Sequence, residues 1–247
     1  MSTDITRLLE EWPYDSDNSV RIITAEDGRR VLQVRQPLGI EQYELEGRPD
    51  GECPDGFDTV VDAVEHRLVE YQLAHGTEEG FELREDDVEE LQNEGVLFYY
   101  RYLLLFQLND FERVIRDTAH NLRICELLEQ YTTDDQETEA VLQFKPYIYR
   151  MHSVAHAMQK VQEHESSEAR AILEEAIEVI QAMQEIDTPA FQFERVRSVN
   201  YLRSTLEQID DAPDDPVARL REELEAAVEQ ENYERAAQLR DHIRGLS

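Results

Sequence analysis

The stretch Val96-Leu-Phe-Tyr-Tyr-Arg-Tyr-Leu-Leu-Leu-Phe-Gln-Leu108 lies near the middle of the 247-residue chain and is its most apolar segment. Of its 13 residues, 11 are apolar, so a helix formed by this stretch is apolar on nearly all sides. The stretch is too short to span a membrane, and it contains Arg101. We therefore predict that it forms the second half of a central buried helix, which begins at Asp86-Asp87 and ends before Asn109-Asp110.

Helical periodicity continues on both sides of this central helix. Upstream, residues 60–71 repeat apolar side chains at intervals of three and four. Downstream, the same pattern and its breaks predict four further helices. The first covers 111–131, and the second follows the polar gap 132–137 and reaches about His164, with a bend near Pro146. The third is capped by Ser166-Ser167, and the fourth runs from Thr188-Pro189 to about Ile209. Together these segments predict a bundle of helical hairpins.

The N-terminal part of the chain instead has the alternating pattern of strands. Residues 20–24 and 31–35 flank Asp27-Gly28, a typical hairpin turn, and a third strand over 40–46 ends at a turn containing Pro49. A sheet of this size is marginal alone, so we expect it to pack on the helices. The predicted fold class is α+β and mostly α, with a small N-terminal antiparallel β-sheet.

Composition and charge limit the classes of function. The chain has 56 acidic and 24 basic residues, a formal net charge of −32, which argues against direct nucleic-acid binding and against adhesion to anionic membranes. The acidity is also compatible with salt adaptation. Cys53 and Cys125 have no metal-ligand spacing and predict free thiols. Residues 1–7 lack a signal-peptide pattern, and we predict a cytoplasmic protein.

The C-terminal 32 residues repeat the helical pattern separately, after the polar linker 210–215. Pro216 opens a first helix, residues 230–232 interrupt it, and a second helix runs to Gly245, which we expect to end it. The small pair Ala236-Ala237 lets the two helices approach closely, so an antiparallel helical hairpin is predicted. The predicted division is a strand region over 1–57 packed on the body, a helical bundle over 58–209, the linker, and a hairpin over 216–247.

The sequence Leu220-Arg-Glu-Glu-Leu-Glu-Ala-Ala-Val-Glu-Gln-Glu-Asn-Tyr-Glu-Arg-Ala-Ala-Gln-Leu-Arg-Asp-His-Ile243 resembles the UVR motif. This motif is shared by the B and C subunits of the bacterial excinuclease, and it occurs in the activator of the protein-arginine kinase and in some Clp ATPases. Two departures are Leu224, where methionine is frequent, and Tyr233, where phenylalanine is commoner. The stretch 38–51 resembles a segment of bacterial UVR-motif proteins of unassigned function.

The resemblance implies a hairpin that binds protein, usually another such hairpin, and performs no chemistry. We therefore predict a non-enzymatic interaction or adaptor protein that engages a UVR-bearing or related partner, a second copy of itself included. Two settings stay open, regulation of arginine-kinase/Clp proteolysis and an accessory role in excision repair, and a hairpin docked only in cis is the alternative. The predicted partner-binding residues are Leu220, Leu224, Tyr233, Glu234, Ala236, Ala237, Leu239, Arg240 and Ile243.

The rival hypothesis is a helical metal-dependent enzyme. His152 and His156 are one helical turn apart, and Asp117 and His120 lie on a neighbouring helix, so the four could hold a metal if the helices face each other. The spacing lacks the general-base glutamate of HExxH, and the chain has no P-loop. We therefore predict no catalytic residues, no metal and no cofactor.

Three tyrosines of the central helix have two interpretations. Tyr99, Tyr100 and Tyr102 either pack in the core or line a groove for a peptide. Aromatic residues in an apolar helix are most often buried, so core packing is the favoured interpretation.

Overall fold

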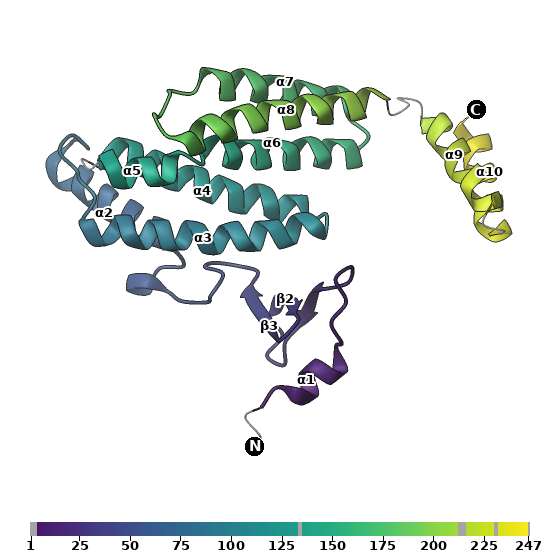
Figure 1. Ribbon diagram of the computed structural model, residues 1–247, viewed down its shortest axis with the longest axis horizontal. Coiled ribbons are helices and arrows are strands. Elements are labelled where there is room, and N and C mark those ends of the chain that lie inside the picture. Colours follow the sequence, from purple (N-terminus) through teal and green to yellow (C-terminus); the bar gives the residue numbers. More distant parts are fainter. Residues whose placement is uncertain (1–3, 133–134, 212–215, 230–231, 247) are drawn as a thin grey trace.

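The structure is a computed structural model that describes residues 4–132, 135–211, 216–229 and 232–246. It confirms the predicted class, since the fold is α+β and mostly α (Figure 1). The N-terminal elements are α1 (Thr6–Glu11), β1 (Val20–Thr24), β2 (Arg30–Gln36), β3 (Gly39–Glu44) and η1 (Pro54–Gly56). The bundle consists of α2 (Val60–His75), α3 (Glu85–Gln107), α4 (Phe111–Tyr131), α5 (Asp135–Leu142), α6 (Lys145–Gln162), α7 (Ser166–Ala182) and α8 (Pro189–Asp211). The last two helices are α9 (Pro216–Glu229) and α10 (Tyr233–Leu246).

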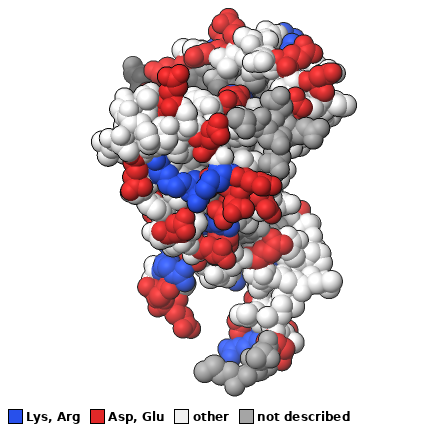
Figure 2. Space-filling model, turned by 90° about the vertical axis from the view of Figure 1, so that its left-hand side faces the viewer, with Lys and Arg blue, Asp and Glu red and all other residues white. Residues whose placement is uncertain are grey.

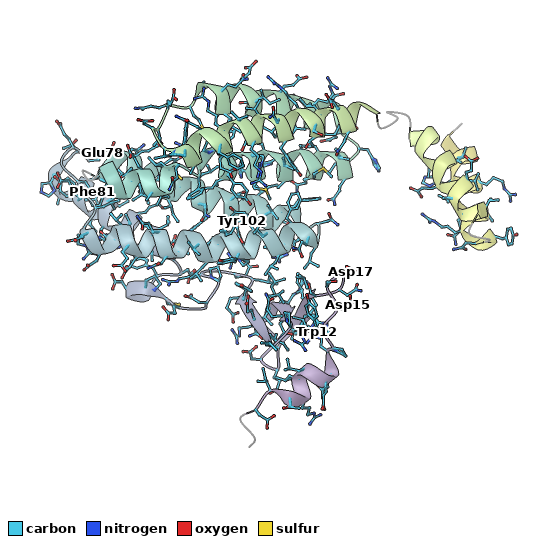
Figure 3. The ribbon with its side chains drawn as sticks, in the orientation of Figure 1. Trp12, Asp15, Asp17, Glu78, Phe81 and Tyr102 are labelled. Atoms are coloured by element: carbon cyan, nitrogen blue, oxygen red, sulfur yellow. The ribbon has the colours of Figure 1, made fainter. Side chains whose placement is uncertain are left out.

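The three strands form the predicted antiparallel meander in the order β1-β2-β3. Leu32 in the central strand lies opposite Ile22 on β1 and Tyr43 on β3. Its side chain is fully buried in one apolar cluster with Tyr102 and Leu105 of α3. The sheet therefore packs on the bundle, as a sheet of this size must to be stable. Trp12 lies beside the sheet, and the guanidinium of Arg21 is 3.7 Å from the centroid of its ring (Figure 3).

A buried ion pair joins the sheet to the bundle. Arg101 of α3 and Asp117 of α4 are both fully buried, and Nε and Nη2 of the arginine donate to the two carboxylate oxygens at 2.7 and 2.8 Å. The third nitrogen, Nη1, donates to the backbone oxygens of Glu44 and Gly47 at 2.9 and 2.8 Å. Because the guanidinium of one α3 residue binds both a carboxylate on α4 and backbone oxygens at the end of β3, it fixes the sheet on this side of the bundle.

The helices of the bundle are layered. Figure 1 shows α3, α4 and α6 side by side, with α7 and α8 packed on α6. Leu91 of α3 and Leu128 of α4 are buried together with the apolar face of α2, whereas Leu173 and Leu202 belong to a second cluster between α6, α7 and α8. Tyr102 lies in the middle of the bundle (Figure 3). The predicted helix that contains residues 96–107 exists as α3, but it is not buried on all sides: it lies between the sheet and α4, and Val96 and Tyr100 are each 51% exposed.

Three details differ from the prediction. The helix predicted to bend near Pro146 is two helices, because Pro146 occupies the first turn of α6, where its missing N–H is not needed. Ser166 is the first residue of α7 and not its cap, since the N-cap is Glu165 and makes no side-chain bond. Gly245 lies inside α10 and does not end it. The bounds of the predicted gap and linker also differ, since α5 already begins at Asp135 and α8 continues to Asp211. The remaining residues 133–134 and 212–215 lie outside the described residues.

Three further observations concern membrane-spanning helices, the thiols and the surface charge. None of the helices in the described ranges combines the length and the apolarity that a membrane span needs. Both cysteines are free thiols, Cys53 at the surface and Cys125 in the core, where burial raises the pKa of the Cys125 thiol to about 12. Acidic side chains are spread over the face drawn in Figure 2, with Lys and Arg in smaller groups among them.

Candidate functional site

The C-terminal helices α9 and α10 pack against each other as a two-helix hairpin with an interior of its own. Ala227 of α9 is buried with Ala236 and Leu239 of α10, and Leu220 and Leu224 of α9 pack partly buried beside them. The small alanine side chains at the centre let the two helix backbones come close. Several of the predicted contact residues thus form the inside of the hairpin in this structure.

Local hydrogen bonds define the start of α10. The side-chain oxygen of Asn232 accepts from the backbone N–H of Arg235 at 3.3 Å, which is the usual N-cap contact. The backbone N–H of Asn232 donates to the carbonyl of Ala227 at 2.8 Å and so turns the chain back onto α9. An ion pair between Arg235 and Glu223, 3.2 Å long, joins the two helices. Residues 230–231 of the predicted break lie outside the described residues.

The outer surface of the hairpin presents apolar groups next to the turn. Tyr233 is 68% exposed and Val228 is 50% exposed. Of the other predicted contact residues, Ala237 and Ile243 are half-buried and Arg240 is exposed, while the side chain of Glu234 lies outside the described residues. The sequence prediction omitted Val228 from the contact residues, although Val228 directly follows the interior residue Ala227.

Figure 1 shows the hairpin beyond the C-terminal end of α8, as a separate pair of helices. Within the described part of the chain, its apolar cluster consists of residues of α9 and α10.

Residues 214–247 match the UvrB/uvrC motif family. The resemblance predicted from the sequence is therefore confirmed for the hairpin, which is a UVR motif. No curated protein and no solved structure matches the chain. The match begins at residue 214, two residues before α9, so the UVR motif describes the C-terminal helices and not the sheet and the bundle.

The four side chains of the metal hypothesis are engaged elsewhere. Both carboxylate oxygens of Asp117 accept from Arg101, and His120 lies 2.9 Å from Glu94 and stacks on the ring of Phe98 at 3.7 Å between centroids. Glu94 in turn accepts from the first backbone N–H groups of α2, so this cluster caps the N-terminus of that helix. These contacts are structural and leave no ligand set on α4.

The second half of that hypothesis is a histidine pair on α6. The ring centroids of His152 and His156 are 4.6 Å apart, and Nδ1 of His152 lies 2.9 Å from the hydroxyl oxygen of Thr118. Burial lowers the pKa of His152 to about 4, with a smaller effect of His156, and burial also lowers the pKa of His156. Among the described residues there is no group of three or more His, Cys, Asp or Glu that could hold a metal ion. The four residues are therefore not brought together as the metal hypothesis requires.

Proposed function

We propose that the chain is a non-enzymatic interaction protein whose UVR hairpin binds another protein. The observation that carries this proposal is the match of the UVR motif to a hairpin with its own interior and an exposed tyrosine. Aromatic side chains that are exposed in the free protein are frequent anchors of protein interfaces, since they bury a large apolar area at small cost in conformational entropy.

The energetics of the hairpin support a role that needs a partner. Two helices of 14 residues with three buried apolar side chains remove little surface from water, and isolated helices of this length are marginal in water. Docking of the outer face, which contains Tyr233 and Val228, would add the missing burial. The partner we propose is another UVR hairpin or a related protein, a second copy of this chain included.

The setting of this interaction is also part of the proposal. Regulation of an arginine-kinase/Clp proteolysis system and an accessory role in excision repair both use UVR-bearing partners. The net charge of −32 disfavours direct contact with a phosphate backbone. In a repair setting the chain would therefore act through protein contacts alone.

The test compares the intact chain with a Tyr233→Ala variant. Each is used as bait in extracts of its native cell, and the self-association of each is measured by sedimentation equilibrium. Loss of an exposed aromatic anchor is expected to weaken binding at least tenfold, or about 1.4 kcal/mol or more. Because Tyr233 lies on the outside, this change leaves the hairpin interior intact, whereas Leu239→Ala would remove part of that interior.

A matched control is Tyr14→Ala, which removes an exposed tyrosine near α1. The proposal expects a partner, or a dimer, that is retained by the Tyr14→Ala chain and lost with Tyr233→Ala. If both variants retain the same partners and the same mass as the intact chain, the hairpin does not bind through this face, and docking in cis becomes the better account.

A further inference from the structure

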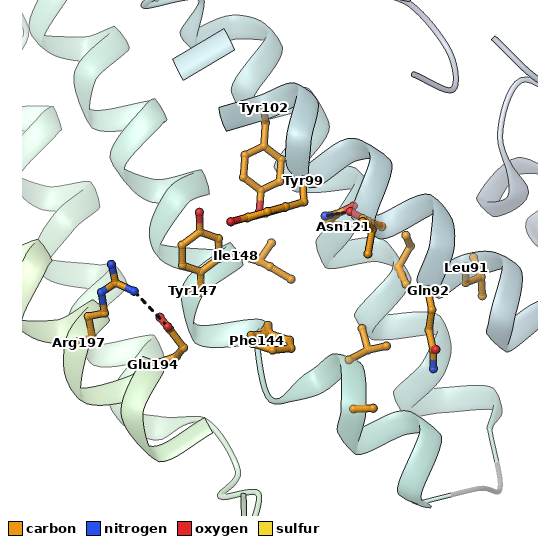
Figure 4. Close-up of a pocket in the computed structure, with 15 residues that line it drawn as sticks. Leu91, Gln92, Tyr99, Tyr102, Asn121, Phe144, Tyr147, Ile148, Glu194 and Arg197 are labelled. Carbon is orange, nitrogen blue, oxygen red and sulfur yellow. Dashed lines mark hydrogen bonds and ion pairs between the residues drawn. The ribbon is translucent and has the colours of Figure 1, made fainter. Parts of the chain in front are cut away.

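A cavity of about 490 Å³ opens in the side of the bundle, far along the sequence from the UVR hairpin (Figure 4). One wall is a face of α3, and the other is formed by the end of α5 and the start of α6. α4 contributes Asn121 and Ile124, and Glu194 and Arg197 of α8 lie at one end. Most of the lining is apolar, and its larger members include Leu91, Val96, Phe144, Tyr147 and Ile148.

The mouth of this cavity exposes apolar side chains from several helices. Val96 on α3 is 51% exposed, and Phe144 between α5 and α6 is also exposed. Phe193 on α8 is 63% exposed, and its ring lies 5.9 Å from the guanidinium of the lining residue Arg197. Apolar groups exposed around one opening are typical of a surface that docks another macromolecule, not of an enclosed small-molecule site.

Three buried polar atoms of the lining have no hydrogen-bond partner within the described part of the chain. They are the hydroxyl of Tyr102, Oδ1 of Asn121 and Oε2 of Glu194. The amide nitrogen of Asn121 already donates to the carbonyl of Gly95 at 2.9 Å. Two of the three free groups are therefore acceptors, and buried acceptors without donors are unfavourable. An occupant that brings N–H groups into the cavity would satisfy them.

The dimensions and the charge indicate the kind of occupant. The lining of α3 extends over residues 91–102, which is about 16 Å or three helical turns. A groove of this length between two helical walls suits a helix with apolar anchors on successive turns. Of the two charged lining residues, Glu194 is paired with Arg197 at 3.3 Å, so the negative field comes from the surrounding chain, with its net charge of −32 and the exposed Glu139 next to the lining residue Ala140. A basic helix is the complement of such a surface.

We propose that this cavity is a docking groove for a basic amphipathic helix of a partner protein. It is a second interaction site, separate in the fold from the UVR hairpin, and it does not depend on the function proposed for the hairpin. A chain with both sites would join two proteins.

The test uses the full-length chain and a fluorescein-labelled 18-residue helical peptide of Lys and Leu with all Leu on one face. Fluorescence anisotropy at 0.15 M KCl gives its affinity. Two control peptides have the same Leu face with Glu in place of Lys, and the Lys/Leu composition in scrambled order. The intact chain is expected to bind the first peptide at least tenfold more tightly than either control.

The decisive variant is Gly95→Leu. A Cβ at Gly95 would lie 3.5 Å from Ile124 and 3.8 Å from Asn121, which are ordinary contacts, and because Gly95 lines the cavity we expect the rest of the leucine side chain to fill part of it. This uncharged change, and separately Val96→Glu, is expected to weaken binding at least tenfold. Val69→Glu on α2, where the valine is also 51% exposed but lies outside this cavity, is the matched control and is expected to bind as the intact chain does.

Circular dichroism first establishes that each variant is folded. Equal binding by Gly95→Leu and the intact chain would show that the peptide adheres to the acidic surface elsewhere, and it would overturn the proposal. If the Lys and Glu peptides bind equally well, the groove does not prefer a basic helix, and that part of the proposal is wrong. If Tyr233→Ala binds the peptide more tightly than the intact chain, the hairpin itself occupies the groove and the variant has released it. If the chain takes up an apolar dye but binds no peptide, the cavity is a small-molecule site. Both results would overturn a partner helix.

Discussion

His152 is held inside the bundle as a hydrogen-bond donor. The hydroxyl of Thr118 donates to the carbonyl oxygen of Val114 at 2.7 Å, so its proton is already used. With the hydroxyl proton placed there, Nδ1 of His152 is the donor in the contact of 2.9 Å with the Thr118 oxygen. Burial disfavours a second, charging proton on the ring, and the neighbouring His156 adds a smaller effect, so the pKa of His152 falls to about 4.

This lowered pKa predicts a pH-dependent contribution of His152 to stability. In the unfolded chain the histidine binds a proton as the pH falls below about 6.5, whereas the folded chain takes it up only near pH 4. The contribution is therefore complete above pH 6.5 and is lost as the pH falls through about 4. Allowing for partial solvent screening, we expect a loss of about 1–2 kcal/mol over this window.

The measurement is urea unfolding of the intact chain and of His152→Gln at several pH values. The difference in free energy of unfolding isolates this residue, since the protonation of the many carboxylates affects both proteins alike. The intact chain should lose its advantage over the variant between pH 7 and pH 4. A constant difference across this range would mean that His152 is not buried in its neutral form.

The contact between α3, α4 and the end of β3 depends on the Arg101–Asp117 pair. A buried ion pair adds little net stability when formed, but removal of one partner leaves the other charge buried and uncompensated. We expect Asp117→Asn to lower the free energy of unfolding by about 3–5 kcal/mol. Denaturant unfolding measures the loss, and hydrogen exchange should show the largest increase in β3 and in the turn that follows it.

A control for this prediction is Glu11→Gln, which removes an exposed ion pair with Arg7 on α1. Exposed pairs are screened by water and contribute little to stability, so this variant should be nearly as stable as the intact chain. A small loss in Asp117→Asn, similar to that of the control, would mean that water reaches the Arg101 guanidinium.

At the scale of helices and strands, periodicity was sufficient for the positions of most elements and insufficient for their contacts. The alternation around Asp27-Gly28 and the apolar face of 60–71 report local structure, and β1, β2 and α2 follow from them. The ion pair between Arg101 and Asp117 joins two different helices, and no periodic spacing in the sequence relates the two residues. The same holds for Glu94, whose carboxylate binds the start of α2 from another helix.

The candidate sites show the same limit. The UVR hairpin was predictable because all its contacts lie within about 30 consecutive residues. The groove draws its lining from α3, α4, α5, α6 and α8, so it exists only after the bundle forms. The tyrosines divide between the two interpretations, since Tyr102 is buried in the core and also lines the cavity with Tyr99, whereas Tyr100 is exposed and is not among the lining residues.

For the whole molecule the dominant property is the charge of −32. Repulsion among the carboxylates opposes the compact state, because unfolding separates them. Added salt shortens the range of this repulsion from about 10 Å at 0.1 M to about 3 Å at 1 M. We expect the melting temperature to rise with KCl over this range, by about 2–4 °C for each kcal/mol of repulsion removed.

Screening should act in the opposite direction on binding to the groove. The attraction between the acidic chain and a basic helix arises from the same negative charge and is screened by the same ions. KCl should therefore weaken binding of the Lys/Leu peptide while it stabilises the fold. Circular dichroism melts and anisotropy titrations on the same samples measure both trends, with an uncharged osmolyte as the control for excluded volume. A melting temperature that falls with KCl would show that ion pairs such as Arg101–Asp117 outweigh the net repulsion. A peptide affinity that is independent of KCl would assign the binding to the apolar lining alone.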